Sequence, residues 1–209
     1  DGNSTETIAK DITLYAKWTP KTYTVIFKTG ESTTYHTGDV SYNTTVAQPA
    51  APAKDGYTFV GWYTDEACTN KFNFDTSITG NVTLYAKWDV NKYTVTVNTG
   101  DSSYDTSYEY GKSVTILVPT KTGAAFLNWT PDPAGLKLTE NEDRSVTFTM
   151  PVRNVTLTAN WSTNSYTVTF DSNGHDVGLT VTVAHNSKVA EPTVLQETGY
   201  TFVGWYTDK

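Results

Sequence analysis

One tryptophan-ended motif recurs along the chain at a near-constant spacing, and this periodicity constrains the fold more than any other feature. Its copies are Asp11–Trp18 (DITLYAKW), Asn81–Trp88 (NVTLYAKW) and Asn154–Trp161 (NVTLTANW). Because the copies end at residues 18, 88 and 161, they are 70 and 73 residues apart. The period predicts tandem structural units of that size.

Two further motifs share the period. After four intervening residues each tryptophan is followed by an opening motif, at Tyr23–Phe27 (YTVIF), Tyr93–Val97 (YTVTV) and Tyr166–Phe170 (YTVTF). A third motif, Gly56–Asp65 (GYTFVGWYTD), recurs letter for letter at Gly199–Asp208. Three independent motifs with one period exclude a chance similarity.

Apolar and polar residues alternate within these motifs, which is typical of strands with one buried face. The buried faces of the opening and closing motifs are expected to hold Tyr23, Val25 and Phe27, and Ile12, Leu14, Ala16 and Trp18. The 40 threonines and 14 tyrosines favour strands too, and no stretch has an amphipathic helical period. We therefore predict a mainly β fold, with small sheets of a few twisted strands and little or no helix.

The third motif breaks the alternation, because Phe59 and Trp62 are three residues apart. If both are buried, a bulge must absorb one residue, and Gly61 is the natural position. The middle repeat diverges here and has Asn128 in place of that glycine. We predict that the structural core is built on Trp18, Trp62, Trp88, Trp129, Trp161, Trp205, Phe59 and Phe202. The alanine before each closing tryptophan is expected to lie under a large ring.

With these motifs the chain resembles the Listeria–Bacteroides repeat, also called the internalin B-repeat. The middle copy is similar to the divergent branch of that family, through its Thr147–Pro151 segment (TFTMP). The resemblance implies β-grasp-like repeats strung in tandem on secreted or cell-wall proteins, with adhesive or structural roles. It implies no catalytic residues and no cofactor.

The motif spacing predicts four segments. Residues 1–18 form the closing strand of an incomplete repeat, 19–88 a complete repeat, 89–161 a divergent complete repeat, and 162–209 the opening part of a truncated repeat. The junctions are only four residues long, which predicts limited bending between repeats.

The two incomplete segments are complementary. Joined tail to head, residues 162–209 and 1–18 would make one repeat of 66 residues, cut in an exposed loop as by a trypsin-like protease. We expect head-to-tail self-association, in which residues 1–18 of one molecule complete the sheet of residues 162–209 in another.

The bulk composition excludes several classes of function. A net charge of -7 with 15 scattered lysines and arginines disfavours nucleic-acid binding. No apolar run is long enough to insert into a membrane. The single cysteine, Cys68, cannot form an intrachain disulfide.

No residue pattern predicts a catalytic or metal site. The segment 171–176 (DSNGHD) faintly resembles a calcium loop but lacks the bidentate glutamate, and Asn-Gly favours a hairpin turn. The histidines His36, His175 and His185 have no nucleophile motif beside them. We predict no metal, no cofactor and no enzymatic activity.

Two functions remain. The first is a spacer or adhesive stalk on the surface or cell wall of a bacterium, or on a secreted protein. The second is a module that binds glycans or a host surface protein through exposed rings. The tyrosines proposed for the second function are Tyr15, Tyr63 and Tyr85 on strands, and Tyr35, Tyr42, Tyr104, Tyr108 and Tyr110 in loops.

Overall fold

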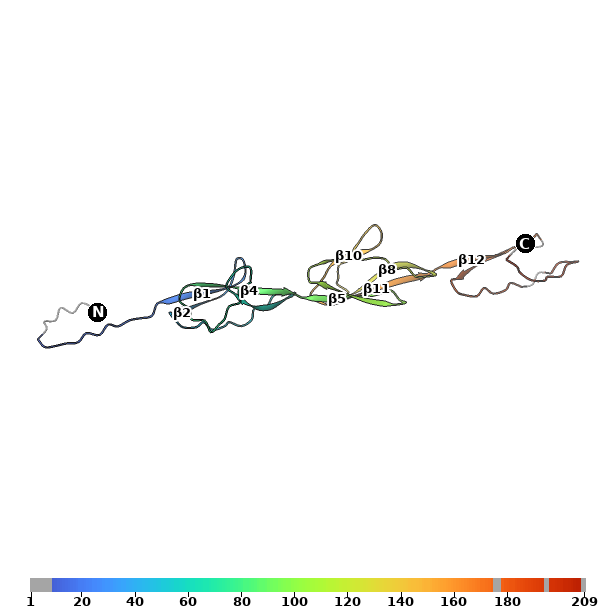
Figure 1. Cartoon of the computed structure of the whole chain (residues 1–209). Helices are drawn as coiled ribbons and strands as arrows, with labels where there is room; N and C mark the ends of the chain where they lie inside the picture. The colour runs from blue at the N-terminus through green and yellow to red at the C-terminus, as the bar shows by residue number, and fades with distance from the viewer. Residues whose placement is uncertain (1–8, 175–177, 194–195, 208–209) are drawn as a thin grey trace. The chain divides into compact units, whose positions relative to one another are not determined.

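The computed structural model describes residues 9–174, 178–193 and 196–207. Within these ranges the regular secondary structure consists of β-strands, and no helix is present (Figure 1). The mainly β prediction is therefore confirmed. The chain divides into two compact units, residues 1–89 and 90–209, each of which is described by itself.

The first unit holds a four-stranded mixed sheet. Its strands are β1 (Thr22–Gly30), β2 (Thr33–Ser41), β3 (Tyr57–Tyr63) and β4 (Val82–Val90), in the order β2-β1-β4-β3. The opening motif forms β1, the third motif forms β3 and the closing motif forms β4. The central strands β1 and β4 are parallel, and β2 is antiparallel to β1, so the first and last strands of the repeat lie side by side in a β-grasp-like sheet.

Alternation along the central strands creates the core of this unit. Val25, Phe27 and Leu84 are completely buried, while their strand neighbours Thr24, Ile26 and Thr83 are partly exposed. Trp62 of β3 packs its ring on Phe27, with ring centroids 4.9 Å apart. Side chains from the irregular segments beside the sheet close the core, namely Val46, Phe72 and Ile78.

The middle repeat, in the second unit, has the same sheet order. Its strands are β5 (Lys92–Asn98), β6 (Ser103–Glu109), β8 (Ala124–Asp132) and β11 (Val155–Thr163), in the order β6-β5-β11-β8, and β5 is parallel to β11. A second sheet is formed by β7 (Ser113–Ile116), β9 (Thr139–Glu140) and β10 (Val146–Thr149). This second sheet is where the sequence diverges most from the first repeat.

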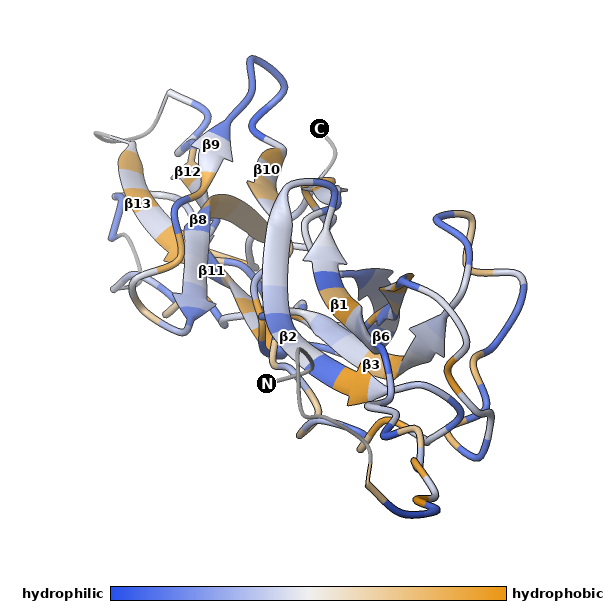
Figure 2. Cartoon of the chain, turned by 90° about the vertical axis from the view of Figure 1, so that its left-hand side faces the viewer, coloured by the Kyte–Doolittle hydropathy of each residue, from blue (hydrophilic) through white to orange (hydrophobic). Residues whose placement is uncertain are grey.

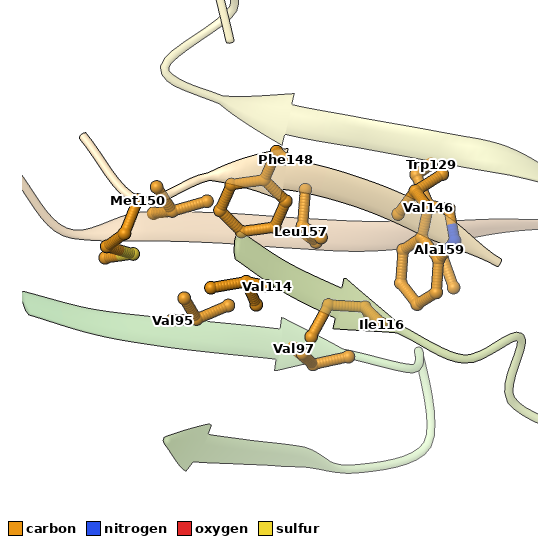
Figure 3. Packing of buried hydrophobic residues seen from close by; sticks show 11 residues of the cluster. Val95, Val97, Val114, Ile116, Trp129, Val146, Phe148, Met150, Leu157 and Ala159 are labelled. Atoms are coloured by element: carbon orange, nitrogen blue, oxygen red, sulfur yellow. The ribbon is translucent and has the colours of Figure 1, made fainter. Parts of the chain in front are cut away.

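Buried side chains from both sheets meet in one core, which Figure 3 shows from close by. Phe148 and Met150 belong to the divergent segment and are 4% and 0% exposed, so that segment forms part of the core. Trp129 and Ala159 are cross-strand partners, and both are buried. A ring therefore lies beside this alanine, as the sequence predicts for this position.

The bulge in the middle repeat lies one residue earlier than Asn128. Phe126 pairs with Trp161 and Asn128 pairs with Asn160, so Leu127 is the extra residue. Arg144 donates hydrogen bonds from its guanidinium to the carbonyls of Phe126 (3.1 Å) and Leu127 (2.6 Å). In the first repeat and in the C-terminal segment, the glycine at the position of Asn128 has a positive φ angle, 152° at Gly61 and 155° at Gly204.

The last segment forms a two-stranded hairpin from β12 (Ser165–Phe170) and β13 (Leu179–Ala184). Hydrophobic and paler bands alternate along β13 in Figure 2, as the two-residue period requires. Residues 201–206 follow the hairpin and form no strand, although the same sequence forms β3 in the first repeat. Since the local sequence is identical, the difference comes from the neighbouring strand that the hairpin lacks.

Candidate interaction surface

The eight predicted core aromatics fall into three classes of exposure. Trp62 and Trp129 are 1% and 8% exposed. Partly buried positions are held by Trp88, Trp161, Trp205, Phe59 and Phe202. Trp18 differs from the prediction, because its side chain is 88% exposed. Its segment, residues 11–18, has no regular secondary structure in this chain, so no sheet covers the ring.

The exposed segment presents an apolar stripe. Leu14 and Trp18 are 86% and 88% exposed, and Ile12 is 49% exposed. The equivalent residues of β4 are Leu84, which is fully buried, and Trp88, whose indole N–H donates to the carbonyl of Thr29 at 3.3 Å. The same sequence pattern is therefore a core strand in a complete repeat and an unpaired segment at residues 11–18.

The second surface is a groove of about 730 Å³ in the C-terminal segment. One wall runs from Val168 in β12 to Asn173 beyond the end of that strand, and the other runs from Tyr200 to Thr207. Phe170 and Trp205 lie at its base, with ring centroids 5.0 Å apart. The groove thus exposes apolar and aromatic surface between two stretches of backbone.

The repeat spacing identifies what fills this position elsewhere. Val168–Asp171 corresponds to Val25–Lys28 of β1, and 200–206 corresponds to β3. In the first repeat β4 lies between those two elements and pairs with Val25–Lys28. The groove therefore lies at the position that β4 occupies in the first repeat, and Phe170 and Trp205 correspond to the core residues Phe27 and Trp62.

A recurring asparagine, not predicted as a site residue from the sequence, attaches the closing strand at its start. The side-chain oxygen of Asn81 accepts the N–H of Thr24 at 3.0 Å, and that of Asn154 accepts the N–H of Thr94 at 2.9 Å. The signal was present in the sequence, because asparagine begins both closing motifs. Asp11 takes this position in the exposed segment and also carries an acceptor oxygen.

The tyrosines proposed for glycan binding are used differently in the structure. Tyr63 is 7% exposed and thus part of the packed interior. Tyr35 donates its hydroxyl to the carbonyl of Ala50, and its ring contacts Trp62. Tyr42 contacts Tyr23, and Tyr104 is 51% exposed. The remaining four, which are partly exposed or exposed, are Tyr85, Tyr108, Tyr110 and Tyr15.

The polar candidates form ordinary turns. Asp171 accepts the N–H of Asn173 at 2.9 Å, and Asn173 and Gly174 have positive φ angles, as a hairpin turn requires. His175, like the aspartate at 176, lies outside the described residues. His36 contacts Phe27, and His185 contacts Tyr166. Among the described residues, no group of three or more His, Cys, Asp or Glu side chains could hold a metal ion.

The free thiol and one carboxylate have shifted acidities. Partial burial raises the pKa of Cys68, and the nearby charge of Asp65 raises it further, so the thiol is a poor nucleophile. The backbone N–H groups of Thr69 and Asn70 lower the pKa of Asp65. Its carboxylate accepts them at 3.0 Å and 2.7 Å, which closes the loop after β3.

In the part of the chain that the structure describes, no helix has the length and apolar character needed to cross a membrane.

Comparison with known proteins agrees with the repeat boundaries seen in the sheets. The Listeria-Bacteroides repeat domain matches residues 23–87 and 166–209. The divergent InlB B-repeat domain matches residues 93–165, which is the repeat with the second sheet. Together the two models cover nearly the whole chain.

Three curated relatives are similar over different lengths. A putative membrane protein of Evansella cellulosilytica is 37% identical over 98% of this chain, and a putative Gly-rich membrane protein of the same organism is 36% identical over 95%. Internalin H of Listeria monocytogenes is 44% identical over 40%. The chain spans 31%, 23% and 15% of the lengths of these relatives.

A solved structure, Mub-RV, is matched over 66% of this chain and 98% of its own length, at 13% identity and a TM-score of 0.19, too low to carry an argument. The repeat models, by contrast, match the motifs and the sheets they form. The chain therefore belongs to the Listeria-Bacteroides repeat family and carries a divergent InlB B-repeat domain in its middle.

Proposed function

We propose that the chain is part of a non-catalytic, load-bearing spacer or stalk in a bacterial cell-surface or secreted protein. The relatives support this location, since they are putative membrane proteins and an internalin. The observation that carries the proposal is the position of the two terminal strands within each complete repeat.

Tension along the chain enters the first repeat at the start of β1 and leaves it at the end of β4. These strands are parallel neighbours, paired from Val25–Val82 to Lys28–Tyr85. Tension therefore pulls the pair at opposite ends and loads its ladder hydrogen bonds together, in shear. The middle repeat has the same arrangement, with β5 parallel to β11 from Val95–Val155 to Asn98–Thr158.

The junctions support the same role, because they contain little free chain. Only Asn91 separates β4 from β5, and only Asn164 separates β11 from β12. Within the second unit, Asn164 donates its N–H to the carbonyl of Gly123 and accepts the N–H of His185, both at 2.8 Å. A Cβ at Gly123 would collide with the His185 imidazole, so this junction is closely packed.

Single-molecule force spectroscopy on the whole chain tests the proposal. We expect two cooperative unfolding events, one for each complete repeat. From the start of the opening strand to the end of the closing strand, the first repeat has 69 residues (22–90) and the middle repeat 72 (92–163). These lengths correspond to roughly 230–260 Å of extended chain less the folded length. The hairpin β12–β13, which has no parallel partner strand, is an internal control and should extend without a comparable force peak. Extension without two such peaks would contradict the spacer function.

A glycan-array screen of the same chain distinguishes the alternative function. A spacer gives no specific signal. Saturable binding of one glycan class that is lost in Tyr104→Ala, the variant of an exposed ring, would instead favour a recognition module.

A further inference from the structure

We propose that a ring-on-glycine joint fixes the hairpin β12–β13 against the middle repeat. Gly123, in the middle repeat, receives the imidazole of His185, which follows β13. The proposal rests on the proposed spacer function for its purpose, since a spacer needs joints with limited bending. Its test measures orientation and not rupture force, so the failure of one proposal is distinguishable from the failure of the other.

The socket of the joint is a glycine with a left-handed backbone. Gly123 has a φ of 70° and lies in a turn in which Ala124 donates its N–H to the carbonyl of Lys121 at 3.3 Å. Lys121 also forms an ion pair with Asp101 at 2.7 Å, which ties the turn to the middle repeat. A Cβ at Gly123 would fall on the atoms Cδ2, Cγ and Nε2 of the His185 imidazole. The ring therefore occupies space that only a glycine leaves open.

Backbone hydrogen bonds hold the ring and the socket together. Asn164, the single residue between β11 and β12, donates its N–H to the carbonyl of Gly123 at 2.8 Å. Its own carbonyl accepts the N–H of His185, also at 2.8 Å. The imidazole contacts the ring of Tyr166, with centroids 5.9 Å apart and an angle of 53° between the planes. The linking residue is thus bonded on both sides, and the ring is positioned by its own hairpin.

The ring position recurs in every copy of the opening hairpin. The residue after the second strand is Tyr42, Tyr110 or His185, and its N–H donates to the carbonyl just before the opening strand, at 2.7, 2.8 and 2.8 Å. The next residue has a positive φ each time, 64° at Asn43, 75° at Gly111 and 60° at Asn186. Tyr42 contacts Tyr23 at 6.3 Å and 55°, close to the geometry of His185 on Tyr166. The end of this hairpin is therefore built to present a ring.

The glycine position recurs as well, with a φ of 77° at Gly56, 70° at Gly123 and 89° at Gly199. A left-handed turn by itself is enough to favour glycine. Gly111 is such a case, because none of the described residues places an atom within 4 Å of its Cβ position. At Gly123 the backbone angle and the ring both require a glycine.

The shape of the socket defines the partner that fits it. A flat ring can lie on the methylene of a glycine, whereas the tetrahedral branches of an aliphatic side chain cannot approach as closely. Tyrosine holds the position of His185 in the other two hairpins. A tyrosine at residue 185 should therefore serve the joint, and an alanine should not.

NMR orientation measurements on the whole chain test the joint. In the unmodified chain, the residual dipolar couplings of amides in β5, β11, β12 and β13 should fit one alignment tensor. His185→Ala should loosen the joint, so that the hairpin aligns several-fold more weakly than the middle repeat. His185→Tyr is the matched control and should keep the single tensor.

The hairpin itself should be unchanged in these variants. His185 lies beyond the last ladder pair, Ser165 with Ala184, so the chemical shifts within β12 and β13 should agree in all three proteins. Two different tensors in the unmodified chain would overturn the proposal. A single tensor in His185→Ala, or equal loosening in His185→Tyr, would overturn it as well.

Substitution of the socket tests the joint from its other side. Gly123→Ala and Gly111→Ala both place a Cβ on a left-handed residue of the middle repeat, so both should destabilise that repeat. Gly123→Ala should also increase the exchange rate of the Asn164 amide by about tenfold relative to the amides of β5. The same selective increase in Gly111→Ala would contradict a joint at Gly123.

The double variant Gly123→Ala with His185→Ala separates the collision from backbone strain. If Gly123→Ala acts by displacing the ring, removal of the ring should add little to the exchange rate of the Asn164 amide, because the contact is already lost. Additive effects of the two substitutions would show that these residues act independently, and would overturn the proposal.

Discussion

At the scale of single residues, the recurring tryptophans serve two different purposes. Trp62 and Trp129, from the third motif, fill the interior, and their indole N–H groups are buried without a partner. Burial of an unpaired N–H is unfavourable, and ring contacts compensate for it. Trp88 and Trp161, from the closing motif, instead donate their N–H groups to the carbonyl of Thr29 in β1 and to that of Thr99, the residue after β5. One class packs the core and the other attaches strand to strand.

Trp62→Ala should destabilise the first repeat by about 3–5 kcal/mol, because the lost ring leaves a cavity beside Phe27. Trp18→Ala should leave the stability of the dilute monomer unchanged, since that ring is exposed. Chemical denaturation of both variants at low protein concentration measures the difference. A similar loss of stability in both would mean that Trp18 is packed in the monomer.

Asp65 should make the loop after β3 sensitive to acid. The folded pKa lies below the ordinary value of 3.8, so the stabilising contribution is present above that value and is lost as the pH falls through the folded pKa. The amide NMR signals of Thr69 and Asn70 should titrate together with a midpoint below 3.8. Asp65→Asn should abolish that titration, and a midpoint above 3.8 would contradict the hydrogen-bonded loop.

At the scale of strands, identical sequences give different structures when their neighbours differ. The segment 57–63 is a strand beside β4, and the same sequence at 200–206 is not a strand in the absence of such a neighbour. Strand preference thus depends on cross-strand packing more than on the residues themselves. A two-residue period predicted which faces of β1 and β4 are buried, since the neighbours of those strands belong to the same repeat.

The divergent segment shows what the sequence could not predict. The short strands β7, β9 and β10 form the second sheet, yet their short apolar alternations give no sign of which strands pair. The only local signal in the sequence was a glycine or asparagine at the position of residue 128, and it did not indicate the bulge at Leu127. Its position depends on Arg144, which is distant in sequence and binds the bulge carbonyls.

Arg144→Ala should destabilise the middle repeat by about 1–2 kcal/mol, because two charge-assisted hydrogen bonds to the bulge are lost. Arg153→Ala, a change of the same charge outside these contacts, is the control and should have little effect. Thermal unfolding of the two variants measures the comparison. An equal stability of both would show that the bulge is maintained without the guanidinium.

At the scale of the whole molecule, tandem repetition places the same mechanical element in the chain more than once. Each complete repeat begins and ends with adjacent parallel strands, β1 with β4 and β5 with β11. The C-terminal hairpin has the opening strand without the closing strand, and the exposed segment at residues 11–18 has the sequence of a closing strand. The proposed load-bearing role rests on this repeated pairing of parallel terminal strands.

The direction of pulling tests the load-bearing account most directly. In the first geometry the whole chain is stretched through handles at Lys21 and Val90, which shears β1 against β4. In the second the handles are at Lys21 and Asn81, and the same two strands are peeled apart from one end. The rupture force should be several-fold higher in shear than in peeling. Equal rupture forces in the two directions would contradict the claim that the parallel terminal strands carry the load.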